Sequence, residues 1–369
     1  MDRKYDEKLI DLIKEKQYIH KEENLDILVK PVPDFNSEEK IDPRVYKDLR
    51  IMAFFNRFMP KSIRSLSLKE KNIKKTRLAF NKVDSHKMVN KKISIEDFYI
   101  EVDDGYNMHM RAYMQDDKSK KFPILYYIHG GGFFAGSTDV VDEAMRLLVA
   151  KYKVVIFSVD YRLAPEYKYP RGHKDTYFGL KWLVDNAYKF GGDSSNIFVA
   201  GDSAGGNLAQ YCSNKSTEDN LSNIKGQVLL YPVLNFSDKK DKYYNIDFSK
   251  FKISKKHKSV ADFALNMMEG SNDDLVSLIN IKDREDYYIS PYLEVNPKLV
   301  PTMISVGELD FFRQESIAYA KKLNDLGIDV TTILYRGISH AYLDQVGNYP
   351  QSEDCVNEIG KFIYKYSKD

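Results

Sequence analysis

The sequence has few residues of the kinds that staple small secreted proteins or bind metal ions. Only two cysteines, Cys212 and Cys355, occur in 369 residues, which excludes a disulfide framework and favours two buried thiols. No H-E-x-x-H motif and no Cys/His cluster is present, so no metal is expected. A phosphate-binding G-x-x-x-x-G-K-[ST] motif and a dinucleotide fingerprint are also missing, and we expect no cofactor.

Long uncharged apolar runs and a surplus of one charge sign are missing as well. The first 17 residues, MDRKYDEKLIDLIKEKQ, carry charge on nearly every helical turn, unlike a signal peptide. No later segment has the about 18 apolar residues that span a bilayer, so we expect no membrane insertion and a cytoplasmic location. The chain has 56 Lys and Arg residues and 54 Asp and Glu residues, a net charge of +2. This balance gives no indication of a nucleic-acid partner, and we expect none.

The first 90 residues have a different pattern from the rest of the chain. They are rich in Lys, Glu and Asp, and their apolar residues recur at helical spacing, as in Leu9, Ile10, Leu12 and Ile13. Prolines interrupt this stretch, which favours several short helices over one long helix.

From residue 93 onward the apolar residues follow the period of β-strands. Residues 93–102 and 108–114 alternate around an Asp104-Gly105 turn, which predicts a β-hairpin. Continuous apolar strands are then predicted at residues 124–129, 154–161, 197–201, 228–231, 303–307 and 330–335. Helices are predicted at residues 175–190, from about residue 203, and at residues 314–326 before Gly327. Such alternation predicts an α/β fold with a mostly parallel sheet covered on both faces, and the hairpin as its antiparallel edge.

One polar block interrupts this alternation. Residues 236–285 have helical apolar spacing around Ala261, Leu265 and Met268, and they separate two predicted strands. Insertions of this length in a compact domain are usually functional. We expect residues 236–285 to pack with residues 1–91 as a helical cap over the mouth of the sheet. Residues 92–235 and 286–369 would then form the catalytic domain.

The strongest chemical signal is the pentapeptide Gly201-Asp202-Ser203-Ala204-Gly205, a G-x-S-x-G motif. It directly follows a predicted strand and precedes a helical run, the context of a nucleophile elbow in which a strained turn exposes the serine hydroxyl. The motif alone leaves open a glycine-rich turn without chemistry, or one that binds phosphate. The structural context favours Ser203 as a nucleophile.

A second glycine-rich motif, His129 to Phe133 with sequence HGGGF, also ends a predicted strand. Bare backbone N–H groups are what an acyl transfer needs to stabilise its oxyanion. We predict that Gly131 and Gly132, together with Ala204 after the nucleophile, form the oxyanion hole. A merely flexible loop is the alternative. His129 itself is interpreted as a residue that fixes the loop rather than as a general base.

A serine nucleophile needs a base, and the base needs an acid that orients it. Only two histidines follow Ser203. His257 lies among lysines in the polar insertion and is expected to be solvated, whereas His340 follows the last predicted strand, at the sheet edge where ligands bind. Asp310, after the strand at 303–307, is the preferred acid, and Glu308 is the alternative. The order Ser, acid, His predicts a triad of Ser203, Asp310 and His340.

Together these motifs resemble the hormone-sensitive-lipase-like (GDXG) esterase family of the α/β-hydrolase superfamily. The matching segments are HGGGF at 129–133, DYRLAPE at 160–166 with Pro170, GGD at 191–193, GDSAGG at 201–206, Tyr231-Pro232, Ser290-Pro291, Asp310 and His340. The resemblance implies an α/β-hydrolase fold, a cap from the N-terminus and an insertion, and the oxyanion hole named above. After Asp310 the family's second aspartate is missing, and both cap segments are longer than in small acetyl esterases.

The segment 160–170 also carries charged residues, Asp160, Arg162 and Glu166. We interpret it as an ion-paired turn behind the oxyanion loop rather than as a site. The function predicted is hydrolysis of small carboxylic esters, with short to medium acyl chains, through an acyl-enzyme. The alternatives are an amidase or deacetylase with the same triad, and a non-catalytic ligand-binding protein on the same fold. The oligomeric state stays open.

Overall fold

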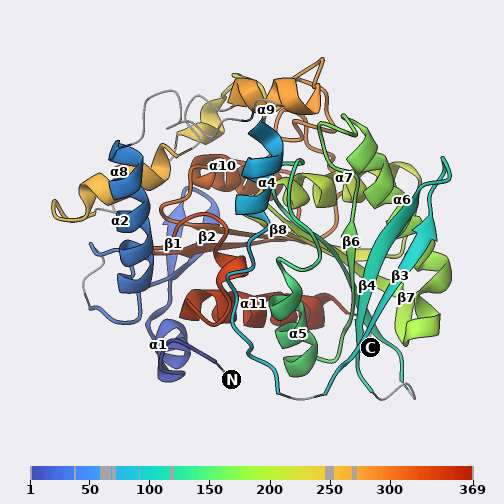
Figure 1. The fold of residues 1–369 in the computed structure, drawn as a ribbon, viewed down its shortest axis with the longest axis horizontal. Helices are drawn as coiled ribbons and strands as arrows, with labels where there is room; N and C mark the ends of the chain where they lie inside the picture. Colours follow the sequence, from blue (N-terminus) through green and yellow to red (C-terminus); the bar gives the residue numbers. More distant parts are fainter. Residues whose placement is uncertain are drawn as a thin grey trace.

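The protein folds around one large sheet, shown by a computed structural model (Figure 1). It describes residues 2–36, 39–58, 68, 72–90, 92–116, 120–245, 253–267 and 272–367. The described strands form a ten-stranded sheet in the order β1-β2-β10-β9-β8-β7-β5-β6-β4-β3. Their bounds are β1 Tyr18–Glu22, β2 Leu25–Lys30, β3 Ser94–Glu101, β4 Asn107–Met114, β5 Phe122–Ile128, β6 Val155–Asp160, β7 Gly192–Asp202, β8 Ile224–Leu230, β9 Thr302–Gly307 and β10 Val330–Tyr335.

The pairing of the strands confirms the predicted α/β architecture. Strands β5 to β10 pair with one another in parallel, and β6 and β9 are buried along almost their whole length. The predicted hairpin is β3 and β4, which pair antiparallel with Ser94 opposite Met114. Strand β4 also pairs antiparallel with β6, so the hairpin forms an antiparallel edge.

Helices cover both faces of the sheet, as expected. Helices α6, α7 and α10 lie on one side, and α5 and α11 lie on the other (Figure 1). The sequence pattern predicts α6, α7 and α10, whereas α5 and α11 were not expected. The described helices are α1 Lys8–Lys16, α2 Pro43–Phe58, α4 Ile73–Phe80, α5 Asp142–Lys151, α6 Arg171–Asn186, α7 Ala204–Glu218, α8 Lys258–Leu265, α9 Asn272–Ile279, α10 Arg313–Asp325 and α11 Pro350–Tyr366.

The prediction that residues 1–91 belong wholly to a helical cap is wrong for residues 18–30. These residues form β1 and β2, and β2 lies parallel to β10 with Ile27 opposite Thr332. Side chains at alternate positions, Leu25, Ile27 and Val29, are buried in the core, which is the pattern of a strand rather than of a helix. The N-terminal segment therefore extends the sheet before it reaches α2.

Helix α2 contacts α8, so part of the N-terminal segment does pack with the insertion. The expectation that His257 is solvated is wrong, because its ring is half-buried and stacks on Tyr46 of α2 with 4.5 Å between centroids. The Ile41 N–H donates to His257 Nδ1 at 3.1 Å. Burial, with help from Lys256 and Lys40, lowers the pKa of His257. Met268, named in the predicted insertion helix, lies outside the described residues.

The sequence also predicted two buried thiols and no membrane-spanning segment. Cys212 and Cys355 are both free and buried, as expected for structural thiols. None of the described helices has the length and hydropathy that a bilayer span requires.

Candidate active site

The serine of the G-x-S-x-G motif occupies a strained turn between β7 and α7. Ser203 has φ 53° and ψ −117°, a conformation that non-glycine residues rarely adopt. The turn is tight enough that a Cβ on Gly201 would lie 2.1 Å from the Gly205 carbonyl oxygen, and one on Gly205 would lie 2.0 Å from the Ile128 oxygen. Glycine is therefore required on both sides of Ser203.

The loop after β10 brings His340 to this serine. His340 Nε2 lies 3.0 Å from Ser203 Oγ, and His340 Nδ1 lies 2.8 Å from Asp310 Oδ2. Asp310 comes from the loop after β9 and is buried, while the His340 side chain stays 18% exposed. Three residues from three separate loops at the carboxyl ends of parallel strands thus form one hydrogen-bonded row.

The alternative acid, Glu308, faces elsewhere. Its carboxylate pairs with Arg336 at 3.0 Å and accepts a hydrogen bond from the Gly337 N–H at 2.7 Å. Both carboxylate partners belong to the segment directly after β10, and burial raises the pKa of Glu308. This geometry favours Asp310 over Glu308 as the group that orients His340.

Aromatic rings surround the imidazole of His340. The Phe311 ring lies 4.4 Å from it at an interplanar angle of 31°, and the rings of Phe312 and Tyr231 approach at steeper angles. Phe311 and Phe312 stand where this sequence departs from the run that usually follows the acid in the resembled family. These contacts hold the ring orientation and give the site an apolar wall.

The three N–H groups predicted for an oxyanion hole remain available to a ligand. Among the hydrogen bonds of the described residues, none uses the N–H of Gly131, Gly132 or Ala204. Gly131 and Gly132 have φ values of +111° and +61°, and a Cβ on Gly131 would lie 2.2 Å from the Ala135 carbonyl oxygen. Ala204 begins α7, where the helix dipole adds positive potential.

A substitution at Gly131 should therefore damage activity directly. We expect Gly131→Ala to lower kcat by about 10²- to 10³-fold, because the loop must shift and the N–H group predicted to hold the oxyanion would be misplaced. Gly105→Ala is a matched control, since Gly105 also has positive φ, at +79°, but no atom lies within 4 Å of its added Cβ. Steady-state kinetics of both variants, with thermal unfolding, would test this. An equal loss in the two variants would contradict a role for the loop.

Side chains on several elements fix this glycine loop. Asp202, next to the nucleophile, accepts hydrogen bonds at 2.9 Å from the Gly130 N–H and from the Tyr127 hydroxyl. His129 Nδ1 lies 2.7 Å from the Gly130 oxygen, and its ring stacks on Tyr161 at 4.5 Å. These contacts support the interpretation of His129 as a residue that fixes the loop.

One anchor of the loop was not identified from the sequence. Arg77 of α4 donates to the Phe134 carbonyl oxygen at 2.6 Å and to the Ala164 oxygen at 2.8 Å, and it pairs with Glu166 at 2.7 Å. A lysine-rich helical segment gives no sign of such long-range contacts, so no local signal could have found Arg77.

The segment 160–170 is the ion-paired turn that was expected. Arg162 pairs with Asp175 at 2.6 Å and with Asp104 at 2.8 Å. Asp160 accepts from the Thr138 N–H at 2.6 Å, lies 2.7 Å from His109 Nδ1, and comes within 3.9 Å of His129 Nε2.

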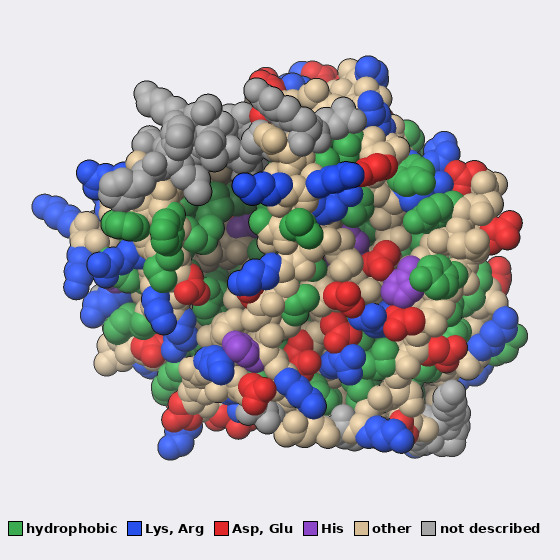
Figure 2. Space-filling view, viewed as in Figure 1, with side chains coloured by type: hydrophobic (Ala, Val, Ile, Leu, Met, Phe, Trp, Pro, Cys, Tyr) green, Lys and Arg blue, Asp and Glu red, His purple; other side chains and the backbone are tan. Residues whose placement is uncertain are grey.

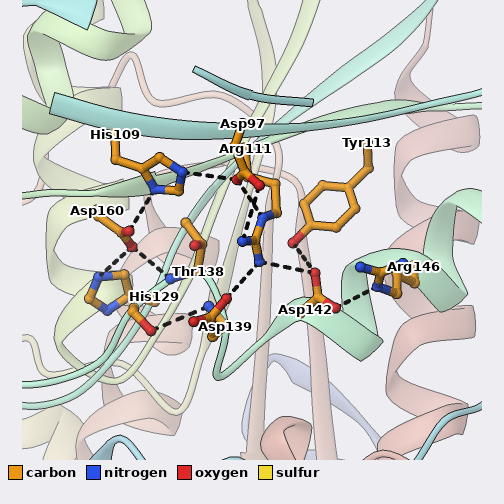
Figure 3. A network of polar contacts seen from close by, with 11 residues as sticks. Asp97, His109, Arg111, Tyr113, His129, Thr138, Asp139, Asp142, Arg146 and Asp160 are labelled. Atoms are coloured by element: carbon orange, nitrogen blue, oxygen red, sulfur yellow. Dashed lines mark hydrogen bonds and ion pairs between the residues drawn. The ribbon is translucent and has the colours of Figure 1, made fainter. Parts of the chain in front are cut away.

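Figure 3 shows how this turn connects to the hairpin edge of the sheet. Asp97 lies 2.9 Å from His109 Nε2, so both ring nitrogens of His109 face carboxylates. His109 therefore links a surface strand to Asp160 and, through Asp160, to the loop that carries His129. No motif in the sequence singles out His109.

This network predicts a pH-dependent contribution to stability. The hydrogen bond to Asp160, reinforced by Asp97, raises the pKa of His109. Stabilisation by the protonated ring is complete below the unfolded pKa of about 6.5 and is lost as pH rises through the raised folded pKa. We expect His109→Gln to lower the urea midpoint more at pH 6 than at pH 9. His86→Gln serves as a control outside this network, and a pH-independent difference would contradict the prediction.

The described residues contain no group of three or more His, Cys, Asp or Glu side chains suited to a metal ion. The site described above consists of the serine, the imidazole, the carboxylate and the backbone donors. Such a set can perform nucleophilic acyl transfer, because it provides a nucleophile, a base oriented by an acid, and an oxyanion site.

Comparisons with known proteins agree with this geometry. A family model described as alpha/beta hydrolase fold matches residues 125–344, more than half of the chain. The alpha/beta hydrolase R526 of Acanthamoeba polyphaga mimivirus is 30% identical over 228 residues, 60% of this chain and 62% of that protein. An ethyl acetate hydrolase of Pseudomonas putida is 28% identical over 253 residues, 68% of this chain and 76% of that protein. The solved esterase of Pyrobaculum calidifontis matches with a TM-score of 0.69 and 27% identity, over 88% of this chain and 98% of that one.

The chain belongs to the α/β-hydrolase family. Within it, the chain belongs to the hormone-sensitive-lipase-like (GDXG) branch, whose matched members carry esterase and carboxylesterase names. The match spans slightly less than two thirds of the mimivirus protein. These relatives support ester hydrolysis as the class of reaction.

Proposed function

We propose that this protein is a serine carboxylesterase that hydrolyses small carboxylic esters with short to medium acyl chains. One observation carries the proposal, the row in which Ser203 Oγ, His340 and Asp310 are joined at 3.0 Å and 2.8 Å. The unbonded N–H groups beside it supply the second requirement of acyl transfer. A serine hydroxyl needs such a partner because it is a weak nucleophile at its own pKa.

The proposed reaction has two matching halves. Ser203 Oγ attacks the ester carbonyl carbon while His340 Nε2 takes the hydroxyl proton, and Asp310 stabilises the imidazolium that forms. The carbonyl oxygen becomes an oxyanion held by the N–H groups of Gly131, Gly132 and Ala204. Collapse breaks the ester bond, and His340 returns the proton to the leaving alcohol. Water then attacks the acyl-enzyme in the same way and releases the carboxylic acid.

We also propose that α2 and α4, with α8 and α9, form a cap over Ser203, on a catalytic domain that comprises residues 92–235 and 286–369 together with the sheet strands of residues 18–30. The contact of His257 with Tyr46 joins the two cap segments, and α4 contacts the oxyanion loop through Arg77. Such a cap would limit the acyl chain, so activity should fall as the chain of a p-nitrophenyl ester is lengthened.

The proposal is tested by pre-steady-state kinetics with p-nitrophenyl acetate. We expect a burst of p-nitrophenol that approaches one equivalent per active site if deacylation is slower than acylation, and a serine-directed organophosphate should label Ser203 in a peptide map. Ethyl acetate is a second substrate to test, given the likeness to the Pseudomonas putida hydrolase. Absence of both turnover and labelling would favour a ligand-binding protein, whereas faster turnover of a matched amide would favour the amidase or deacetylase alternative.

A further inference from the structure

Exposed apolar side chains gather on two helices of the N-terminal segment. Of the thirteen large hydrophobic side chains that are exposed among the described residues, seven lie between residues 51 and 83. They are Ile51, Met52, Phe54, Phe55, Leu78, Phe80 and Val83, which we call the α2–α4 surface. Phe54 and Phe55 are each 60% exposed and Leu78 is 75% exposed. Scattered apolar residues need no explanation, but such a concentration marks an interaction surface.

The two helices use other residues to pack against the body of the protein. Helix α2 buries Val45 and Leu49, one turn apart, and α4 buries Ile73. Most of the surface of Phe55 and Leu78 therefore stays open to solvent while these helices pack through other residues. Figure 2 shows hydrophobic and basic side chains at both helices, on either side of a hollow in this face of the molecule.

The same surface is positively charged. The described stretches 43–58 and 72–83 contain one acidic residue, Asp48, whose carboxylate accepts a hydrogen bond from the Tyr349 hydroxyl. Four basic side chains in these stretches are exposed and form no ion pair with a described carboxylate. They are Lys47, Arg50, Lys74 and Lys75.

We propose that the α2–α4 surface docks on an anionic lipid surface. Exposed aromatic tips beside unpaired lysine and arginine are the pattern by which peripheral proteins enter the headgroup region of an anionic membrane. A second copy of this chain would bring a second set of the same cations against the first, which disfavours a symmetric dimer through this face. Lipid phosphates instead neutralise the cations while the acyl boundary accepts the apolar side chains.

The α2–α4 surface also contacts the loop of residues 129–136, which carries the proposed oxyanion donors and is called the oxyanion loop. Phe80 packs edge-on against Phe134 with 5.1 Å between ring centroids, and Asn81 accepts a hydrogen bond from the Gly136 N–H at 2.8 Å. Arg77, on the same helix, holds the Phe134 carbonyl oxygen. Docking would thus bring the lipid phase next to the site that carries Ser203. The binding step itself does not depend on the proposed hydrolysis.

The experiment measures co-sedimentation of the full chain, carrying Ser203→Ala, with vesicles. This variant separates membrane binding from ester turnover. Failure to bind vesicles would therefore leave the esterase proposal unaffected, and absence of esterase activity would leave the binding proposal unaffected. We expect partitioning onto phosphatidylcholine vesicles that contain phosphatidylglycerol to exceed partitioning onto pure phosphatidylcholine by about tenfold or more, and to fall as salt is raised. Equal partitioning onto the two vesicle types would overturn the proposal.

Paired substitutions test the surface itself. Phe54→Ser with Phe55→Ser, and separately Lys74→Glu with Lys75→Glu, should each reduce partitioning onto the anionic vesicles by about tenfold. Tyr188→Ser is the control, because Tyr188 is 57% exposed and lies outside the surface. Thermal unfolding verifies that all variants fold. If neither pair of substitutions reduced partitioning, the proposal would be overturned. It would also be overturned if the protein did not bind vesicles and light scattering showed a dimer that the phenylalanine pair abolished.

Discussion

Replacing Ser203 with alanine is expected to lower kcat for ester hydrolysis by about 10⁴- to 10⁶-fold. The hydroxyl is the only group in hydrogen-bond contact with His340 Nε2 among the described side chains, so its removal eliminates the attacking atom and the proton donor together. At about 1.4 kcal/mol for each factor of ten, the barrier rises by roughly 5–8 kcal/mol. Steady-state kinetics on p-nitrophenyl butyrate would measure this loss.

The same substitution should leave the fold intact. Ser203 needs its backbone, not its side chain, for the turn, because its N–H donates to the Leu230 carbonyl oxygen at 2.8 Å. Alanine at φ 53° carries the strain that serine already bears. We therefore expect an unfolding temperature close to that of the parent. Full turnover by a verified Ser203→Ala protein would remove the triad from the mechanism.

The second large effect is expected from Asp310→Asn. Asp310 Oδ2 lies 2.8 Å from His340 Nδ1. As a carboxylate it can only accept a hydrogen bond, so it favours the tautomer that carries the proton on Nδ1 and leaves Nε2 free to act as the base. An asparagine can present an NH₂ group instead, which stabilises the other tautomer and does not offset the imidazolium charge. We expect kcat to fall by about 10⁴-fold with little change in KM.

Glu308→Gln distinguishes orientation of His340 from general support of the loops. It removes the charge paired with Arg336 but keeps an oxygen that can accept from the Gly337 N–H. We expect the free energy of unfolding to drop by about 1–3 kcal/mol while kcat of the folded protein stays within about tenfold of the parent. If Glu308→Gln instead caused the larger loss of kcat, Glu308 would be the orienting acid.

The central sheet was predictable because its signals are local. Continuous apolar runs such as residues 303–307 are read from the sequence within one or two residues of the observed β9, since a buried parallel strand must be apolar on both faces. The hairpin of β3 and β4 was predictable from period-two alternation around Asp104-Gly105. The order of the motifs indicated Ser203 and His340 and left two acids, of which the preferred Asp310 is the one that lies beside His340.

The elements that were missed or misread depend on partners far away in the chain. The turn between β1 and β2 places Glu23 at φ 56°, so it lacks the glycine that usually marks a hairpin, and β2 becomes a sheet strand only because β10 lies beside it. His257 directly follows Lys255 and Lys256 and yet stacks on Tyr46, more than 200 positions earlier. Arg77 and His109 act on the oxyanion loop through contacts that no local pattern records.

The placement of β2 has a consequence for any shortened form of this protein. Without residues 1–30, β10 would present an unpaired row of N–H and C=O groups to solvent, and open strand borders of this kind recruit other chains and aggregate. The Lys30 carbonyl oxygen also accepts from the Arg336 N–H at 2.8 Å, at the start of the loop that leads to His340. We therefore expect residues 92–369 alone to aggregate and to lose the hydrogen bond that fixes the start of the His340 loop, although they contain every proposed catalytic group.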